Sequence, residues 1–250
     1  MSIYVQQKVT LKRLIQFSFV LILFNIVIVQ SVKKDNFSDI KECENDIGLT
    51  VATTDKLAEY YFQTHNNIDT VKNHLDNTIT FLNNNFESSA KKNVLDVGCG
   101  PARDVKYFIN NNIEAIGVDL STTTLEIAKS QVPNAQFFLM DMSKLTFPNE
   151  FFHGVWSCGS FYHLNKKIST ITLAGFNRVL KKGGILFLAI KMGKGEKIVC
   201  KEEYNKLPKF YAFYKVEEII EELEKRGFRI INTILEKKRD VWINIYAQKI

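Results

Sequence analysis

Cysteine and proline are scarce in this sequence, and its first 34 residues contain no acidic side chain. The 250 residues include four Cys and four Pro. The cysteines, at 43, 99, 158 and 200, have no paired spacing, which excludes a disulfide scaffold and a CxxC zinc site. Charged residues make up 24% of the chain and there are 19 Phe, which excludes wholesale disorder. The length suits one domain with extensions or two small domains.

Positive charge is concentrated near the N-terminus. The whole chain has a net charge of +6, but five of its 33 Lys and Arg lie within residues 1–34. The remaining residues hold 28 bases and 27 acids, a net charge of +1. A body so close to neutral has no general attraction for phosphate, so no nucleic-acid partner is expected.

An apolar run lies among these bases. Leu14 to Val32 is 19 residues long, and as a helix it would reach roughly 28 Å, just short of a hydrocarbon core of about 30 Å. Residues 1–34 are therefore predicted to be a signal anchor or a signal peptide. The expected location is a membrane, reached through a single N-terminal helix; secretion after cleavage, or a cytoplasmic protein with a mis-assigned start, are the alternatives. Bases on both sides of the run leave its orientation open, and residues 35–54 are predicted to be a linker.

Residues 55–250 form the predicted domain, in which strand and helix patterns alternate. Helical spacing occurs at residues 105–109, 168–180 and 216–223, and the bases and glycines of 181–184 are predicted to end the second of these helices. The pattern predicts an α/β fold in which helices cover both faces of a mostly parallel sheet, with the last two strands antiparallel. The expected strands are Val94–Val97, Ala115–Val118, Gln136–Leu139, Gly154–Ser157, Ile185–Ile190, Arg229–Leu235 and Val241–Gln248.

The loop after the first of these strands contains the most specific pattern. Gly98 and Gly100 allow a tight turn and the close approach of a ligand. The next two strands end at Asp119, which follows Gly98 by 21 residues, and at Asp141-Met142. In such a sheet these residues meet beyond the carboxyl ends of the strands. Asp119 can accept hydrogen bonds from both hydroxyls of a ribose, and Asp141 and Met142 are placed to bind an adenine edge and flank its ring.

Strand, glycine loop, helix, strand and acid together indicate an adenosine-containing cofactor. A dinucleotide site requires a third glycine, and Arg103 stands at that position. Asp96, two residues before Gly98, would repel a pyrophosphate, whereas it would stabilise a cationic ligand.

Residues 94–103, 117–121, 138–142 and 179–188 resemble the successive motifs of class I S-adenosylmethionine-dependent methyltransferases of the small-molecule type. The resemblance covers about residues 55–250. It implies a Rossmann-like, doubly wound, seven-stranded sheet with an antiparallel last strand, and S-adenosylmethionine as cofactor. Ala102 stands where the family usually has a third glycine. The cofactor contacts it implies are Asp96, Gly98, Gly100, Asp119, Leu120, Asp141, Met142 and Cys158.

Each of these polar residues also has a structural explanation. Asp96 could cap a turn, Asp119 could cap a helix together with Ser121, and Asp141 could be a surface charge. Cys158 is better explained as buried filler than as a nucleophile.

The loops after the fourth and fifth strands, residues 157–164 and 191–196, are expected to face the acceptor. His163 is the candidate general base, because the pKa of histidine lies near neutrality; a structural histidine is the alternative. The other expected acceptor-side residues are Tyr60, Tyr61, Tyr162 and Lys191, of which the first two could equally form an ordinary core stripe. An aromatic run, Phe210, Tyr211, Phe213 and Tyr214, lies in an insertion where acceptor contacts are also expected.

The predicted function is methyl transfer from S-adenosylmethionine to a small-molecule acceptor by in-line displacement. Alignment alone contributes roughly 7–11 kcal/mol to such a reaction, and no metal is expected. A nicotinamide-dependent oxidoreductase and a non-catalytic cofactor-binding relative at a membrane are the alternatives. The acceptor, the methylated atom and the oligomeric state do not follow from these residues.

Overall fold

The computed structural model describes residues 37–87 and 89–250. Contacts divide the chain into two units, residues 1–44 and 45–250. Helix α2 crosses this boundary, and every later element lies in the second unit. The elements are α2 (Phe37–Lys56), α3 (Ala58–Thr64), η2 (Ile68–Thr70), α4 (Lys72–Asn85), β1 (Asn93–Val97), α5 (Arg103–Asn110), β2 (Glu114–Asp119), α6 (Thr122–Gln131), β3 (Gln136–Leu139), η3 (Met142–Lys144), β4 (Phe152–Cys158), η4 (Phe161–His163), α7 (Lys166–Val179), β5 (Leu180–Lys191), β6 (Glu196–Cys200), η5 (Glu202–Tyr204), β7 (Pro208–Ala212), α8 (Val216–Glu224), β8 (Phe228–Lys237) and β9 (Val241–Lys249).

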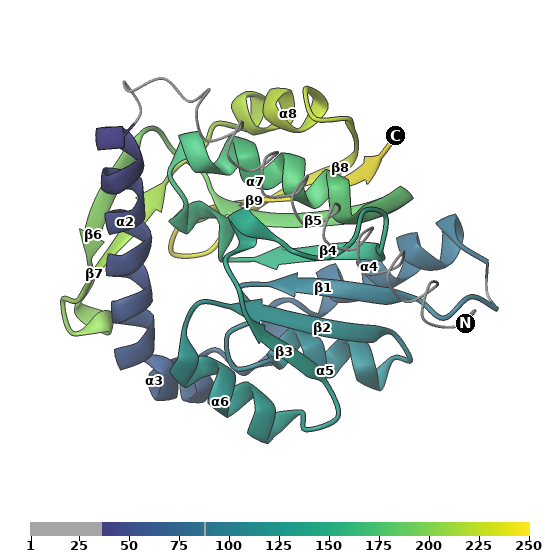
Figure 1. The fold of residues 1–250 in the computed structure, drawn as a ribbon, viewed down its shortest axis with the longest axis horizontal. Helices are drawn as coiled ribbons and strands as arrows, with labels where there is room; N and C mark the ends of the chain where they lie inside the picture. Colours follow the sequence, from purple (N-terminus) through teal and green to yellow (C-terminus); the bar gives the residue numbers. More distant parts are fainter. Residues whose placement is uncertain (1–36, 88) are drawn as a thin grey trace, which may run out of the picture. The chain divides into compact units, whose positions relative to one another are not determined.

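A seven-stranded sheet forms the centre of the second unit (Figure 1), in the order β3-β2-β1-β4-β5-β9-β8. The pairs from β3 to β5 are parallel, and β9 runs antiparallel to both β5 and β8. This confirms the predicted α/β sheet with an antiparallel last strand. The strand order reverses between β1 and β4, and in such sheets the crevice beyond the carboxyl ends at this point binds ligands.

Hydrophobic clusters cover both faces of the sheet, because successive side chains of a buried strand point to opposite sides. On one face Leu188 of β5 packs with Phe176 of α7 and Leu223 of α8. On the other face Trp156 of β4 packs with Phe108 of α5. Each such fully buried side chain stabilises the fold by about 1.5–3 kcal/mol, and together they hold the ends of the strands in place.

Residues 37–56 form helix α2, where the sequence predicted a linker. Thr50 and Thr53 of this helix are buried. The Thr53 hydroxyl donates a hydrogen bond to the carbonyl oxygen of Pro208 at 2.6 Å, and the Thr50 hydroxyl accepts one from the amide of Phe210 at 3.1 Å. These partners lie more than 150 residues along the chain, so helical periodicity could not reveal them. Within the second unit, residues 45–56 of α2 lie beside the hairpin β6–β7 that supplies these partners (Figure 1).

One other segment also differs from the predictions. Residues 181–184 belong to strand β5 and do not end α7, which stops at Val179. They lie opposite a register shift between β4 and β5, and Gly183 has a φ of +79° there, so glycine permits a bulge in the strand. The insertion before α8 forms the hairpin β6–β7.

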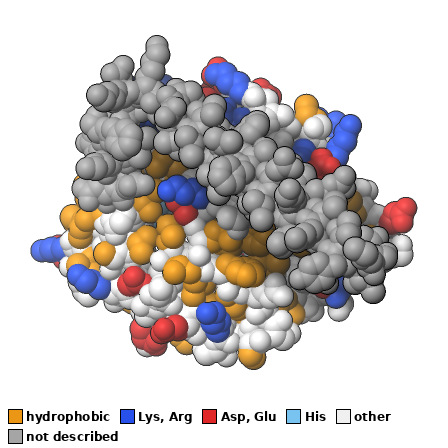
Figure 2. All heavy atoms as spheres, viewed as in Figure 1, with side chains coloured by type: hydrophobic (Ala, Val, Ile, Leu, Met, Phe, Trp, Pro, Cys, Tyr) orange, Lys and Arg blue, Asp and Glu red, His pale blue; other side chains and the backbone are white. Residues whose placement is uncertain are grey.

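The edge strand β3 exposes large apolar side chains. Phe138 is 40% exposed and Leu139 is 59% exposed. Figure 2 shows apolar side chains gathered on one face of the molecule. An edge strand with such side chains is the part of a sheet most open to association.

The predicted signal anchor or signal peptide, residues 1–34, lies outside the described residues. Within residues 37–87 and 89–250, no helix is both long enough and apolar enough to cross a membrane.

Candidate active site

A cavity of about 720 Å³ opens beyond the carboxyl ends of the central strands. Its volume is within the usual range for a small-molecule site, about 300–1,000 Å³. Its wall contains the loops after β1, β2, β4 and β5, part of α2 and α3, and residues of the hairpin β6–β7. The predicted site residues that line it are Gly98, Gly100, Asp119, Leu120, Asp141, Met142, Cys158, His163, Tyr60, Tyr61, Tyr162 and Lys191.

The glycine loop is held against β2 by its own backbone. The amide of Gly98 donates to the carbonyl oxygen of Val118 at 2.8 Å. Gly98 has a φ of +74°, and a Cβ added there would lie 2.3 Å from the Cβ of Ser160. Ala102, at the position of the family's third glycine, also has a positive φ, +70°, at a cost of about 1–2 kcal/mol for an L-residue. The departure from glycine therefore adds strain to the loop.

Asp119 joins the glycine loop to the end of β2. Its Oδ2 accepts a hydrogen bond from the amide of Gly100 and its Oδ1 accepts one from the amide of Ser121, both at 2.9 Å. Burial raises the pKa of Asp119, and these amides oppose the rise. Each carboxylate oxygen retains a lone pair, so two further hydrogen bonds can be accepted. Helix α6 is capped by Ser121 itself, so capping of that helix does not explain Asp119.

Asp141 has both a structural contact and an open oxygen. Its Oδ1 accepts hydrogen bonds from the amide and the hydroxyl of Ser143, both at 2.8 Å, which cap η3. Within the described part of the chain, no residue is hydrogen-bonded to its Oδ2. The structural role and the predicted adenine contact are therefore compatible.

Asp96 is the predicted cofactor residue that does not line the cavity. It is 2% exposed, and its Oδ2 has no hydrogen-bond partner among the described residues. Burial and the neighbouring Asp104 raise its pKa well above the usual range. The sequence predicted that Asp96 contacts a cationic ligand directly. In the structure its side chain instead turns into the protein interior.

Asp104 lines the cavity and was not among the site residues predicted from the sequence. It accepts hydrogen bonds from Arg103 Nε at 2.6 Å and from Trp156 Nε1 at 2.8 Å. Arg103 in turn donates to the carbonyl oxygen of His65 at 2.9 Å, which ties α5 to the end of α3. One sequence feature could have identified Asp104: it lies in the first turn of α5, where the helix dipole favours an acidic residue.

His163 has a defined tautomer. Its Nδ1 lies 2.7 Å from the carbonyl oxygen of Phe210. Because a carbonyl only accepts, Nδ1 is protonated and the lone pair is on Nε2. Burial, followed by the nearby charge of Lys209, lowers the pKa of His163 well below its usual range. The ring is thus neutral at physiological pH, and Nε2 is able to take up a proton.

Cys158 lies in the cavity wall as an unreactive thiol. Burial raises its pKa to about 12, so the thiolate is not populated at neutral pH. This agrees with the filler role. The described residues include no group of three His, Cys, Asp or Glu that could hold a metal ion.

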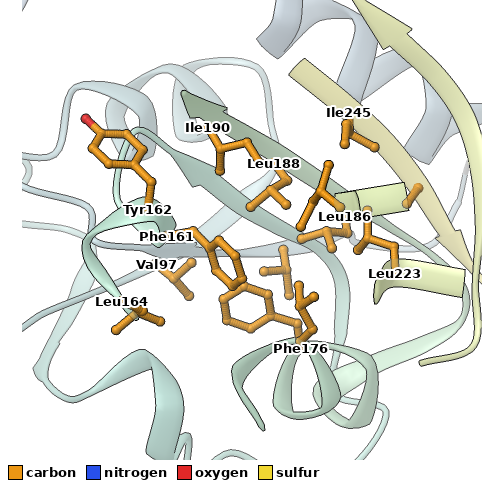
Figure 3. Close-up of a cluster of buried hydrophobic side chains, with 14 of the residues drawn as sticks. Val97, Phe161, Tyr162, Leu164, Phe176, Leu186, Leu188, Ile190, Leu223 and Ile245 are labelled. Carbon is orange, nitrogen blue, oxygen red and sulfur yellow. The ribbon is translucent and has the colours of Figure 1, made fainter. Parts of the chain in front are cut away.

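Tyrosines and lysines from distant segments form the rest of the cavity. Tyr60 and Tyr61 of α3 contact Tyr204 of η5 edge to face, with ring centroids 6.2 and 5.8 Å apart. Tyr162 stacks on Tyr211 at 5.3 Å. Figure 3 shows Phe161 pointing into the hydrophobic cluster and Tyr162 projecting away from it. Lys201, Tyr204, Lys209 and Trp242 also line the cavity and were not predicted from the sequence; of the aromatic run 210–214, Tyr211 alone lines it.

These residues divide the cavity into two halves. The half in which the sequence predicts the cofactor, called the cofactor half, consists of Gly98, Gly100, Asp119, Asp141 and Met142, at the ends of β1, β2 and β3. The other half, called the acceptor half because the sequence predicts acceptor contacts there, consists of Tyr60, Tyr61, Tyr162, His163, Lys191, Lys201, Tyr204, Lys209, Tyr211 and Trp242.

Residues 94–184 match the family model of a methyltransferase domain. A tRNA U34 carboxymethyltransferase from Hydrogenovibrio crunogenus is 30% identical over 172 residues, which are 61% of this chain and 51% of the relative. The chain therefore spans about half the length of that relative.

Solved structures share the fold. A SAM-dependent methyltransferase from Methanosarcina mazei has a TM-score of 0.60 at 16% identity, over 67% of this chain and 95% of its own. The 1,6-didemethyltoxoflavin-N1-methyltransferase of Burkholderia thailandensis, solved with 1,6-didemethyltoxoflavin and S-adenosylhomocysteine, has a TM-score of 0.58 at 17% identity, over 79% of this chain and 88% of its own. These structures confirm the predicted fold, and the family match places a methyltransferase domain model over residues 94–184.

Proposed function

Because the chain carries a methyltransferase domain with the fold of S-adenosylmethionine-dependent methyltransferases, we propose that it transfers a methyl group from S-adenosylmethionine to a small-molecule acceptor. The observation that carries the proposal is the convergence of Gly98, Asp119 and Asp141 on one cavity that continues into an aromatic and basic acceptor half.

The cofactor half fits an adenosyl sulfonium. A side chain at Gly98 would collide with Ser160, so the glycine lets the loop pack closely there, and residues 98–100 line the cavity, where the methionine part of the cofactor can lie against them. Asp119 has two lone pairs for a ribose diol, and Asp141 Oδ2 is open to the amino group of an adenine. The carboxylates also favour a ligand with a positive charge over a pyrophosphate.

The residues of the acceptor half would orient the acceptor and take its proton. The bound cofactor supplies a methyl group on a cationic sulfur. A lone pair of the acceptor forms the new bond to this carbon while the electrons of the old carbon–sulfur bond return to sulfur. Where the acceptor atom is protonated, His163 Nε2 is the proposed proton acceptor in the acceptor half, since Nδ1 is engaged by the carbonyl oxygen of Phe210 and the lone pair is on Nε2.

A small molecule is favoured over a nucleic acid as acceptor, although one relative is named for an action on tRNA. The residues that follow position 34 have a net charge of only +1, and five of the six Lys and Arg that line the cavity are paired with acids. A polyanion gains little from such a surface.

Calorimetric titration of the full chain with S-adenosylmethionine, S-adenosylhomocysteine and NAD tests the proposal. We expect the first two to bind and NAD not to bind. Preferential binding of NAD would favour an oxidoreductase instead. Binding of S-adenosylmethionine without turnover of any compound in a broad acceptor panel would favour a non-catalytic relative.

We also propose that residues 1–34 anchor the protein in a membrane. Support comes from the 19-residue apolar run from Leu14 to Val32 and the bases before it. Alkaline extraction of membranes, followed by N-terminal sequencing of the mature protein, tests this. Retention in the membrane with an intact N-terminus is expected. A protein that starts after residue 31 would indicate a cleaved signal peptide, and one released by alkali would exclude an anchor.

A further inference from the structure

Lys209 of β7 is a buried cation in the wall of the acceptor half. It is 5% exposed, and its Nζ donates a hydrogen bond to the hydroxyl of Tyr61 at 2.8 Å. The same Nζ lies 4.7 Å from the centroid of the Tyr61 ring. No carboxylate of the described residues forms an ion pair with it. A buried charge without such a partner is costly, and burial accordingly lowers the pKa of Lys209 to about 8.

The other cations in the cavity wall all have acidic partners. Lys191 pairs with Asp240, and Lys201 lies 3.5 Å from the same carboxylate. Arg103 pairs with Asp104 at 2.6 Å. Lys238 and Arg239 pair with Glu236 and Glu203. Within the described part of the chain, Lys209 is therefore the lining cation whose counter-ion would have to come from the cavity itself.

The groups that face Lys209 come from several elements. Tyr61 of α3 and Tyr204 of η5 present their rings to it. Asp119 of β2 exerts an opposing, favourable field on its charge, whereas Lys191 of β5 repels it. His163 of η4 is neutral and feels the charge of Lys209. The carboxylate of Asp119 is already held by two amides, so it does not replace a direct partner for Lys209.

The aromatic residues around this site favour a planar ligand over a cationic one. The Nζ of Lys191 lies 5.6, 5.0 and 5.3 Å from the ring centroids of Tyr162, Tyr211 and Trp242. The chain's own ammonium thus occupies the position that an external cation would take in an aromatic cage. The Nζ of Lys209 likewise lies 4.7 and 5.8 Å from the ring centroids of Tyr61 and Tyr204, so an anion that pairs with Lys209 lies beside these two rings, against which a planar group can pack.

On the basis of the proposed function, we propose that the acceptor is a planar, singly charged anion. Its carboxylate, or a comparable oxyanion, pairs with Lys209, and its ring packs against Tyr61 and Tyr204. The oxyanion supplies the charge partner that the folded chain lacks. Acceptors that carry a cationic amine are disfavoured, because Lys191 and Lys209 would both repel them.

Calorimetry with simple probes tests this inference. The full chain is saturated with S-adenosylhomocysteine and titrated at pH 7 with benzoate, benzamide and benzylammonium, which share a ring and differ in charge. We expect benzoate to bind at least tenfold more tightly than benzamide, and benzylammonium not to bind. The variant Lys209→Met should lose the preference for benzoate. Lys197→Gln, which removes an exposed charge from the same hairpin, should retain it.

The outcomes separate this inference from the proposed function. A chain that binds S-adenosylhomocysteine but shows no preference for benzoate would overturn the anionic acceptor alone. The same holds if Lys209→Met keeps the preference. A chain that does not bind S-adenosylhomocysteine would overturn the proposed function and this inference with it.

A second measurement requires no variant. Because the pKa of Lys209 is about 8, much of it is uncharged at pH 8.5, and an oxyanion must restore the proton in order to bind. Benzoate binding at pH 8.5, measured in buffers of different ionisation enthalpy, should therefore take up protons, whereas binding at pH 6.5 should not. Equal proton uptake at both pH values would overturn the assignment to Lys209.

Discussion

The two halves of the cavity are built by different means. In the cofactor half, backbone groups define the geometry. The turn at Gly98 has no space for a side chain, and two backbone amides donate hydrogen bonds to Asp119. In the acceptor half, long side chains such as Tyr61, Tyr204 and Lys209 converge from α3, η5 and β7. The shape of the cofactor half therefore depends on the geometry of the sheet. The side chains of the acceptor half can be replaced without altering the sheet.

This contrast predicts how each half responds to substitution. Changes in the cofactor half should affect stability and cofactor affinity together. Changes in the acceptor half should affect acceptor choice and titration behaviour, while the affinity for S-adenosylhomocysteine is preserved.

The largest effect is expected at Gly98. An alanine Cβ would lie 2.3 Å from Ser160 Cβ, at a φ of +74°. Overpacking and the left-handed backbone together should lower the free energy of unfolding by about 2–5 kcal/mol, as measured by urea denaturation. Gly175→Ala is the matched control: it lies in α7 with no atom within 4 Å of the added Cβ, so its stability should be unchanged or slightly higher. Equal stability of both variants would contradict the account of the loop.

The next largest effect is expected at Lys209, where substitution should raise the free energy of unfolding and not lower it. Its pKa falls from 10.5 to about 8 on folding, so the folded state binds fewer protons than the unfolded state between these values. The cost of burial is therefore complete below pH 8 and disappears as the pH rises toward 10.5. Lys209→Met should be more stable than the parent by about 1–3 kcal/mol at pH 7, and this difference should shrink toward pH 10.5. A difference that is independent of pH would exclude a buried, unpaired ammonium.

A smaller effect concerns the protonation of His163. Because burial lowers its pKa well below the usual range, its ring proton resonances in NMR spectra should not shift between pH 8 and pH 6. The spectrum of His163→Gln assigns the signal. A titration midpoint near the ordinary histidine value of 6.5 would show that the ring is solvated and that the proposed base is not held in the neutral form.

The smallest effect is expected at Asp141. In Asp141→Asn the side-chain oxygen can still accept from Ser143, which keeps the cap of η3. The new amide group would face the donor of an adenine, so the dissociation constant for S-adenosylhomocysteine should rise by about 3–10-fold, which corresponds to the loss of one hydrogen bond. Unchanged affinity in calorimetry would leave Asp141 with its structural role alone.

The sequence predicted the cofactor half because its residues follow directly after strands. Gly98, Asp119 and Asp141 lie at the ends of β1, β2 and β3, and parallel pairing brings strand ends together. The orientation of Asp96 could not be predicted, because it lies within β1 and its position in the strand does not say whether its side chain reaches the cavity or the interior.

Most of the acceptor half could not be predicted in this way. Tyr61 and Lys209 meet across 148 residues, and the hairpin that presents Lys209 pairs with α2 through Thr50 and Thr53. These are tertiary contacts between segments whose local patterns are weak. The sequence feature that marks this wall is the repeated occurrence of lysine and tyrosine within residues 201–211. It indicates a site only when the structure shows that lysines and tyrosines of this segment line the same cavity.

We propose above all that the carboxylate of Asp119 holds the ribose of an adenosyl cofactor. Calorimetry of S-adenosylhomocysteine with the Asp119→Ala variant tests it most directly, with Glu114→Ala at the exposed opposite end of the same strand as control. We expect Asp119→Ala to weaken binding by about 10–100-fold, as the loss of charge-assisted hydrogen bonds implies, and Glu114→Ala to bind as the parent does. Equal affinity of the parent and Asp119→Ala would contradict it.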